Sequence, residues 1–324
     1  MKLVTFSVNG EKRLGAVKGD WKKWDFIVDL NKADPSVPAD ILSFIDACGE
    51  LHGPVWEKAK KIVENAKTGY AMEKVKIHAP IMPRLLRDTI AFRGHIARTR
   101  AARGLPIAPE WDKLPAYYNG NHLNIIGSGD VPLIKFILEE GGKHARETQK
   151  LDYETEIAFI IGKGGKNVEL KHAKEHLFGV TIFNDFSMRD LQLVAMGIGM
   201  GPAYGKDWCN AIGPCIVTMD EFGELESKKI TTKVNGKERL SGTYLDLVFK
   251  NPFVKEGERA LWEFEEAMEF ISHSQEVYAG EVWGSGTVPG GCELERGAEA
   301  QFLRRGDVVE ITVEGIGTLK NRIV

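Results

Sequence analysis

The chain has 324 residues, of which 43% are hydrophobic and 27% are charged, and its formal net charge is −3. This length supports one large domain or two unequal ones, and the charge lacks the basic excess that nucleic-acid binding requires. The sequence contains no run of 18 apolar residues, so no membrane span is predicted. We expect a globular protein that binds neither nucleic acid nor membranes.

The first 82 residues are predicted to form a small β/α domain. Short β-type runs at 3–8, 13–17 and 26–30 are separated by turn signals such as Asn9-Gly10. Apolar residues at helical spacing predict two helices, over 41–48 and 55–66. Prolines cluster after this unit, and we place the boundary near Met82, so that a second domain covers 83–324.

The second domain is predicted to be rich in strands. Apolar runs bounded by Gly, Asn and Asp predict strands at 156–162, 178–185, 213–219, 229–236, 245–250 and 307–315. Helices are expected only at 171–177 and 262–274. Many strands with few helices favour a β-rich α+β roll or sandwich over a doubly wound α/β sheet.

Two glutamates stand two residues apart where the first of these strands begins. Side chains alternate along a strand, so Glu154 and Glu156 point to one face, with Asp152 on the same side. Stacked like charges repel unless a partner compensates them, and a hard cation such as Mg²⁺ or Ca²⁺ would do so. A solvated acidic strand face is the alternative interpretation.

Polar residues follow the next strand directly. Asp185 ends an apolar run, and Arg189 and Gln192 share a face if a helix begins there. Further on, two glycines precede Lys206, which has the charge to bind an anionic group. Considered alone, the segment from Asp185 to Gln192 is better explained as a turn with an Arg–Asp pair on the surface. The segment 283–291 is rich in glycine, but it lacks the motifs of nucleotide binding and of a serine nucleophile.

Histidines and cysteines point to no second metal site in the sequence. His172 and His176 are four residues apart on an expected helix, which we interpret as a solvated face because no third ligand stands nearby. The four cysteines are far apart and form no CxxC pair. We expect them to be reduced and buried. The first residues alternate as in a strand and do not show the apolar region of a signal peptide, so we expect a cytoplasmic location.

Taken in order, five segments resemble the fumarylacetoacetate hydrolase family. They are LDYETEIAFIIGK, FGVTIFNDFSMRDLQ, GKDWCNAIGPCIVT, GSGTVPGG and GDVVEITVEGIGTLKNRI. The resemblance covers residue 80 to the C-terminus and implies a β-roll catalytic domain. Long members of the family carry an additional small N-terminal domain, which fits the first 82 residues.

The resemblance implies a divalent metal, with Mg²⁺ expected first and Ca²⁺ or Mn²⁺ as alternatives. Its ligands would be four carboxylates: Asp88, Glu154, Glu156 and Asp185. Asp88 enters this set because a histidine, His95, follows it seven residues later, as in the family. The segment 88–118 around this histidine has few strand signals and several Gly and Pro residues. We therefore expect it to be a loop that orders over bound substrate as a lid.

The resemblance also implies a catalytic and a substrate-binding set. The catalytic set would be His95, Glu295, Lys206, Arg189 and Gln192. Glu293 competes with Glu295 as the partner of the histidine. Tyr118, seven residues after Trp111, and Thr287 would bind substrate. An arginine that touches substrate in the family is replaced here by Gly104, and Arg98, Arg100 or Arg103 are its possible substitutes.

The implied activity is hydrolysis of a C–C bond in a β-diketo acid or acylpyruvate. In that reaction His95, held by Glu295, would activate water, and the metal would stabilise the departing carbanion. A decarboxylase, hydratase, dehydratase or isomerase of the same family is the alternative. A second alternative is a non-catalytic scaffold that binds a metal or ligand. The resemblance also predicts a homodimer, with a small oxo-acid as the only other partner.

Overall fold

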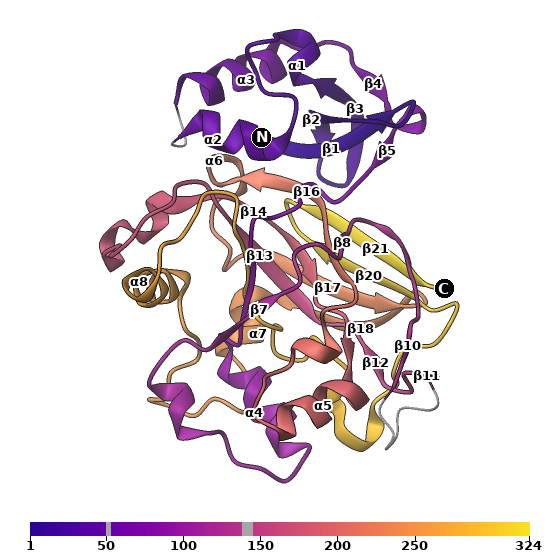
Figure 1. Ribbon diagram of the computed structural model, residues 1–324, viewed down its shortest axis with the longest axis vertical. Coiled ribbons are helices and arrows are strands. Elements are labelled where there is room, and N and C mark those ends of the chain that lie inside the picture. Colours follow the sequence, from indigo (N-terminus) through magenta and orange to yellow (C-terminus); the bar gives the residue numbers. More distant parts are fainter. Residues whose placement is uncertain (50–52, 138–144) are drawn as a thin grey trace.

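The computed structural model describes residues 1–49, 53–137 and 145–324. Its N-terminal part forms the upper portion of the molecule in Figure 1. The strands of this part are β1 (Lys2–Val8), β2 (Glu11–Asp20), β3 (Lys23–Asp29), β4 (Tyr70–Ala71) and β5 (Lys76–Ile77). The helices are α1 (Leu30–Ala33), α2 (Ile41–Cys48), α3 (Pro54–Asn65) and the 3₁₀ helix η1 (Met72–Lys74).

Local sequence explains the first elements. Asn9 and Gly10 both have positive φ, of 53° and 87°, which suits the tight turn that joins β1 to β2. The Asp40 side chain accepts a hydrogen bond from the Ser43 N–H and so caps α2. Pro54 begins α3, where its missing N–H costs nothing. The three strands and two helices that were predicted here are present.

The strands of the remaining chain lie below the N-terminal part. They are β6 (Leu86–Thr89), β7 (Tyr117–Gly120), β8 (Ile125–Ile126), β9 (Gly129–Val131), β10 (Lys135–Phe136), β11 (Arg146–Glu147), β12 (Leu151–Asp152), β13 (Thr155–Ile161), β14 (Leu177–Asn184), β15 (Ser187–Met188), β16 (Asn210–Thr218), β17 (Lys229–Val234), β18 (Lys237–Thr243), β19 (Val282–Gly284), β20 (Val308–Val313) and β21 (Gly317–Ile323).

Helices connect these strands. They are α4 (Arg93–Ala101), α5 (Arg189–Gly197), α6 (Met219–Phe222), α7 (Tyr244–Phe249), α8 (Phe264–Ser274), and the 3₁₀ helices η2 (Pro109–Asp112), η3 (Leu170–His176), η4 (Ala203–Gly205) and η5 (Leu294–Glu299). The abundance of strands confirms the predicted β-rich α+β class.

Two sheets pack face to face. The large sheet runs β4-β3-β2-β1-β16-β14-β13-β19-β6-β7, and β1 joins the N-terminal strands to it by pairing antiparallel with β16. The small sheet runs β18-β17-β20-β21-β9. Ile157 and Ile182 from the large sheet and Ile230 and Ile311 from the small one belong to one buried cluster. Hydrophobic residues therefore fill the space between the sheets, as a sandwich requires.

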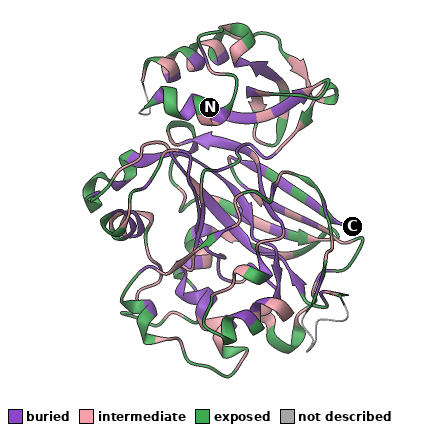
Figure 2. Ribbon diagram, in the orientation of Figure 1, coloured by how far each residue is buried: buried purple, intermediate pink, exposed green. Residues whose placement is uncertain are grey.

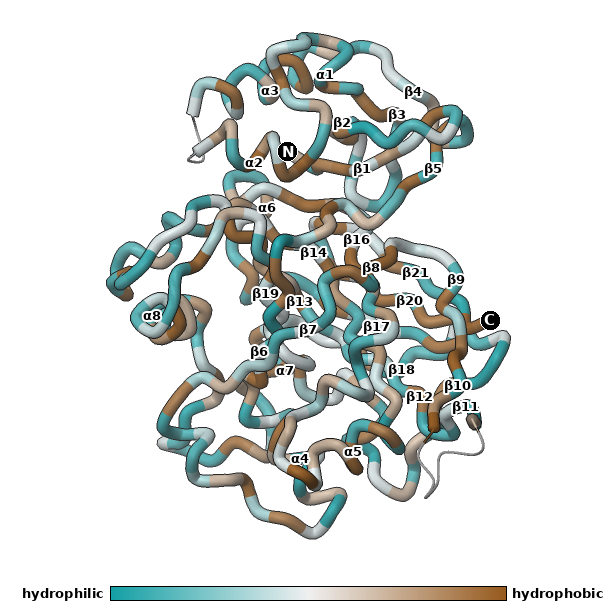
Figure 3. The backbone as a smooth tube through the Cα atoms, viewed as in Figure 1, coloured by the Kyte–Doolittle hydropathy of each residue, from teal (hydrophilic) through white to brown (hydrophobic). Residues whose placement is uncertain are grey.

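The central strands are covered on both faces. Phe44 of α2 packs against Phe178 of β14 with ring centroids 6.2 Å apart, so an N-terminal helix covers the face opposite the small sheet. Figure 2 shows that β13, β14 and β16 are almost entirely buried, and Figure 3 shows hydrophobic residues concentrated along central strands such as β13. The domain boundary near Met82 stays a prediction.

Two segments differ from the sequence interpretation. Residues 245–250 were expected to be a strand but lie mostly in α7, because the Thr243 side chain caps the helix by accepting from the Asp246 N–H. Residues 88–118 were expected to be a loop. They contain α4 and η2, and His95 lies on α4. None of the helices in the described ranges is long and apolar enough to cross a membrane. All four cysteines are free and buried.

Candidate metal centre and active site

Four carboxylates meet where neighbouring strands end. Asp88 lies on β6, Glu154 directly precedes β13, Glu156 is the second residue of β13, and Asp185 follows β14. Their oxygens lie within 4.8 Å of one another, and all four residues are buried. A solvated acidic strand face is therefore excluded, since the two glutamates are 4% and 0% exposed.

Gly284 makes this convergence possible. It lies on β19, between the strands that carry Asp88 and Glu156. A Cβ atom at this position would be 2.3 Å from Asp88 Oδ1 and 2.9 Å from Glu156 Oε2. Only glycine leaves room for both carboxylates. The sequence analysis did not assign this role to Gly284, because it depends on strand order rather than on spacing.

Burial makes the cluster electrostatically costly. It raises the pKa of Asp88, and it raises the pKa values of Glu156 and Asp185 well above the ordinary carboxyl range; the negative charge of Glu154 adds to the rise in each case. Glu156 Oε2 is buried and has no hydrogen-bond partner in the described structure. The cluster lacks positive charge on the Glu156 side.

Two cations compensate the opposite side of the cluster. The Lys206 ammonium lies 2.5 Å from Glu154 Oε2 and also contacts Asp185. Arg189 donates to Glu154 Oε1 at 2.7 Å. Burial opposes ionisation of Glu154, but these two cations outweigh it and lower its pKa. The Lys206 ammonium is therefore in direct contact with two of the carboxylates. Burial alone would lower the pKa of Lys206, but the negative charges of Asp185 and Glu154 raise it.

Arg189 also organises its surroundings. It begins α5 and donates to Asp152 Oδ2 and to Gln192 Oε1, each at 2.9 Å. Asp152 in turn accepts from the backbone N–H groups of Glu293 and Leu294, at 2.9 Å each. The Asp152 carboxylate, 0% exposed, therefore connects α5 to the start of η5.

The structure places His95 next to Glu295 rather than Glu293. His95 Nδ1 lies 2.7 Å from Glu295 Oε1, and the other oxygen of Glu295 accepts from the Gly290 N–H at 2.6 Å. Glu293 instead pairs with Arg239 and accepts from the Tyr153 hydroxyl at 2.9 Å. Its carboxylate is occupied by contacts that stabilise the fold.

The two predicted substrate-binding residues contact metal-ligand candidates. The Tyr118 hydroxyl donates to Asp185 Oδ2 at 2.8 Å, and burial together with Asp185 raises the pKa of Tyr118 well above its usual value. Thr287 Oγ1 lies 3.4 Å from Glu156 Oε1.

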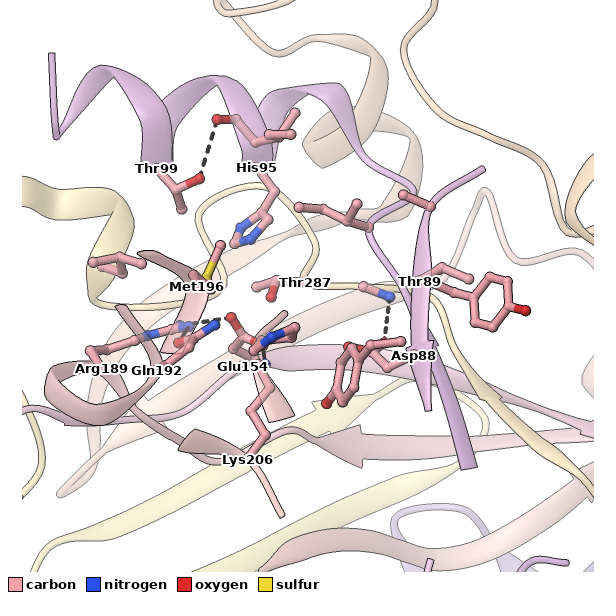
Figure 4. A pocket seen from close by; sticks show the side chains of 18 of the residues that line it. Asp88, Thr89, His95, Thr99, Glu154, Arg189, Gln192, Met196, Lys206 and Thr287 are labelled. Atoms are coloured by element: carbon pink, nitrogen blue, oxygen red, sulfur yellow. Dashed lines mark hydrogen bonds and ion pairs between the residues drawn. The ribbon is translucent and has the colours of Figure 1, made fainter. Parts of the chain in front are cut away.

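A cavity of about 250 Å³ opens over the carboxylates. Figure 4 shows His95 pointing from α4 toward Glu154 and Thr287, opposite Lys206. All predicted site residues line the cavity except Asp185 and Glu295, which lie behind its wall. Other side chains complete the wall, among them Thr99, Arg100, Arg103, Tyr117 and Met196.

The two helical histidines lie elsewhere. His172 is exposed and pairs with Glu175, as a solvated face predicts. That interpretation is wrong for His176, which is buried and bonds to the Lys163 carbonyl oxygen at 2.7 Å. Neither belongs to a potential metal-binding group in the described residues.

The carboxylate cluster fits a hard divalent cation. Its donors are all oxygen, the ligand that Mg²⁺, Mn²⁺ and Ca²⁺ prefer over softer nitrogen or sulfur. Glu156 Oε2 has no hydrogen-bond partner in the described structure, and the pKa values of Glu156 and Asp185 are raised. A cation bound between the carboxylates would compensate this negative charge. Asp88, Glu154, Glu156 and Asp185 are the residues that would hold the ion.

Comparison with known proteins finds relatives that match along the whole chain. The chain is 30% identical over 340 aligned positions to oxaloacetate tautomerase YisK of Bacillus subtilis (strain 168), with both proteins covered completely. It is 24% identical to human oxaloacetate tautomerase FAHD2A, mitochondrial, over 92% of this chain and 84% of that protein.

Solved structures share the fold. The fumarylacetoacetate hydrolase of Exiguobacterium antarcticum matches with a TM-score of 0.68 and 26% identity, covering 100% of this chain and 99% of the other. The 5-carboxymethyl-2-hydroxymuconate delta-isomerase of Mycobacterium smegmatis, at 22% identity, matches with a TM-score of 0.64 over 100% and 99%. Residues 85–324 match the model of the fumarylacetoacetate (FAA) hydrolase C-terminal domain. The chain therefore belongs to the fumarylacetoacetate hydrolase family.

Proposed function

We propose that this protein is a divalent-metal-dependent tautomerase that interconverts the keto and enol forms of a small oxo-diacid such as oxaloacetate. The observation that carries this proposal is a histidine–carboxylate pair facing a four-carboxylate cluster across one small cavity. The full-length similarity to proteins named oxaloacetate tautomerase supports the choice of reaction over the hydrolysis that the sequence motifs favoured.

Proton transfer is assigned to His95. Because Glu295 accepts from Nδ1, the neutral ring keeps Nε2 free as a proton acceptor. A divalent cation held by Asp88, Glu154, Glu156 and Asp185 would supply Lewis-acid polarisation of the substrate. His95 Nε2 takes a proton from the methylene carbon and returns it to the oxo oxygen, so no atom is gained or lost. Glu295 stabilises the imidazolium that forms in between.

Two arginines in the cavity wall suit a second carboxylate of the substrate. Arg100 and Arg103 both line it, and neither guanidinium forms an ion pair within the described part of the chain. Burial and the charges of Arg100 and Arg189 lower the pKa of Arg103, so an anion there would relieve a repulsion. The cavity is smaller than the roughly 300–1,000 Å³ of drug-sized sites, which fits a substrate of few carbons.

The test follows the ultraviolet absorbance of enol oxaloacetate in saturating Mg²⁺. We expect His95→Ala to lower kcat/KM about 10²-fold or more, as loss of a general base does. His172→Ala is the matched control, since His172 is exposed on η3. An unchanged rate in His95→Ala would remove His95 from the mechanism.

Hydrolysis of a C–C bond is a second candidate. The His95–Glu295 pair could equally activate a water molecule, and a structure with 26% identity is named fumarylacetoacetate hydrolase. A panel of acylpyruvates with product identification separates the two reactions, because hydrolysis divides the carbon skeleton and tautomerisation preserves it. Release of pyruvate at a rate above that of tautomerisation would favour the hydrolase.

We also propose that the protein is a homodimer located in the cytoplasm. The support for the dimer is the family itself together with exposed hydrophobic side chains in the catalytic part, such as Phe249, Phe253 and Phe270. Light scattering should give twice the chain mass of 36.0 kDa. A monomer at micromolar concentration would contradict it.

A further inference from the structure

A second set of metal-binding side chains lies beside the cavity. His95, Cys292 and Glu295 each offer a ligand atom, and these atoms lie within 4.8 Å of one another. Cys292 Sγ is 3.8 Å from Glu295 Oε1, the same oxygen that lies 2.7 Å from His95 Nδ1. Neighbouring ligands of a tetrahedral zinc ion are about 3.3–3.8 Å apart, given bond lengths of 2.0–2.3 Å. Small side-chain shifts would therefore bring all three atoms onto one ion.

The donor chemistry differs from that of the carboxylate cluster. Nitrogen, sulfur and oxygen together favour Zn²⁺, whereas an all-oxygen set favours Mg²⁺. One thiolate and one carboxylate would neutralise a zinc ion completely, which is important because Cys292 is 0% exposed. Burial raises the pKa of the Cys292 thiol, so zinc binding must release the thiol proton to solvent. His95 lines the cavity and gives the ion a path from solvent.

We propose that His95, Cys292 and Glu295 form an inhibitory zinc site, separate from the magnesium site. Zinc on Nδ1 of His95 displaces the hydrogen bond to Glu295 and leaves the ring proton on Nε2. The ring can then no longer accept a proton from substrate. The inhibitory effect rests on the proposed role of His95 in proton transfer. Binding of zinc to the three side chains is independent of that role.

Binding is tested first, without substrate. Co²⁺ serves as the zinc probe in protein saturated with Mg²⁺, and thiolate-to-cobalt charge-transfer absorption reports sulfur coordination. We expect the band in the native protein, its loss in Cys292→Ser and Cys292→Ala, and its retention in Cys48→Ser. Cys48 is a suitable control because it is also buried, but on α2. Absence of the band from the native protein, or its persistence in both Cys292 variants, would overturn the proposal.

Inhibition is tested by adding Zn²⁺ to the tautomerase assay at saturating Mg²⁺. Cys292→Ser should keep its basal activity and require at least tenfold more zinc for half-inhibition. A tenfold increase in Mg²⁺ should leave the inhibition of the native protein unchanged. Reversal by Mg²⁺ would mean that zinc displaces the ion of the carboxylate cluster, and the proposal would be wrong. If the protein lacks tautomerase activity, the cobalt band alone decides whether the site exists.

Discussion

At the scale of single residues, Gly284 is the strictest requirement of the site. Gly284→Ala places a methyl group 2.3 Å from Asp88 Oδ1, so the two carboxylates must separate. We expect weaker Mg²⁺ binding by calorimetry and a loss of about 1–3 kcal/mol in the free energy of unfolding, as for other overpacked positions. Gly197→Ala is the control, because a Cβ there meets nothing within 4 Å. Equal Mg²⁺ affinities in the two variants would contradict this role.

The two neighbouring glutamates are expected to separate activity from stability. Glu295→Gln should lower kcat about 10²-fold or more with little change in stability, since it weakens the support of His95. Glu293→Gln should lower the free energy of unfolding by about 1–3 kcal/mol, because Arg239 and Tyr153 lose a buried acceptor. Urea unfolding and steady-state kinetics on both variants measure this. The opposite pattern would assign the catalytic contact to Glu293.

Residue spacing alone predicted only part of the site. The alternation of Glu154 and Glu156, the position of Asp185 after a strand, and the shared helical face of Arg189 and Gln192 are local patterns. Asp88, His95 and Glu295 entered the prediction only through the family motifs, because 198 to 200 residues separate partners such as Gly286 and Asp88 or His95 and Glu295. No local pattern encodes those contacts.

At the scale of elements, strand predictions succeeded where apolar runs are buried on both faces, as in β13 and β14. The expected strand at 245–250 failed because Tyr244 and Val248, four residues apart, are the buried pair of a helix. The expected lid around His95 contains α4, which lies against the site with His95 and Ile96 buried. Its glycines and prolines had favoured a loop.

Asp152 is expected to couple the elements that carry the catalytic groups. Its oxygens accept from four donors, which come from Tyr153, Arg189, Glu293 and Leu294. An asparagine cannot accept from all of them, so Asp152→Asn should lower the free energy of unfolding by about 1–3 kcal/mol and lower kcat more than it raises KM. Asp190→Asn is the control, since Asp190 contacts Thr148 and Gln149 instead. Equal kcat values in the two variants would limit Asp152 to a structural role.

At the scale of the whole molecule, an ion bound by the acidic cluster would couple metal binding to folding. Four buried carboxylates from neighbouring strands repel one another, and an ion held between them removes that repulsion only in the folded state. Mg²⁺ at one hundred times its Kd should therefore stabilise the protein by about 2.7 kcal/mol and raise Tm. EDTA should reverse the effect and abolish activity.

Glu156→Gln distinguishes this linkage from nonspecific salt effects. The partnerless oxygen of Glu156 faces the uncompensated side of the cluster, so removing its charge relieves repulsion when no metal is bound. The variant should unfold at a Tm equal to or above that of the metal-free native protein. It should also lose most of the Mg²⁺-dependent rise, because one ligand charge is gone. Calorimetric scans with and without Mg²⁺ measure both quantities. A variant that gains as much from Mg²⁺ as the native protein would show that the ion binds elsewhere.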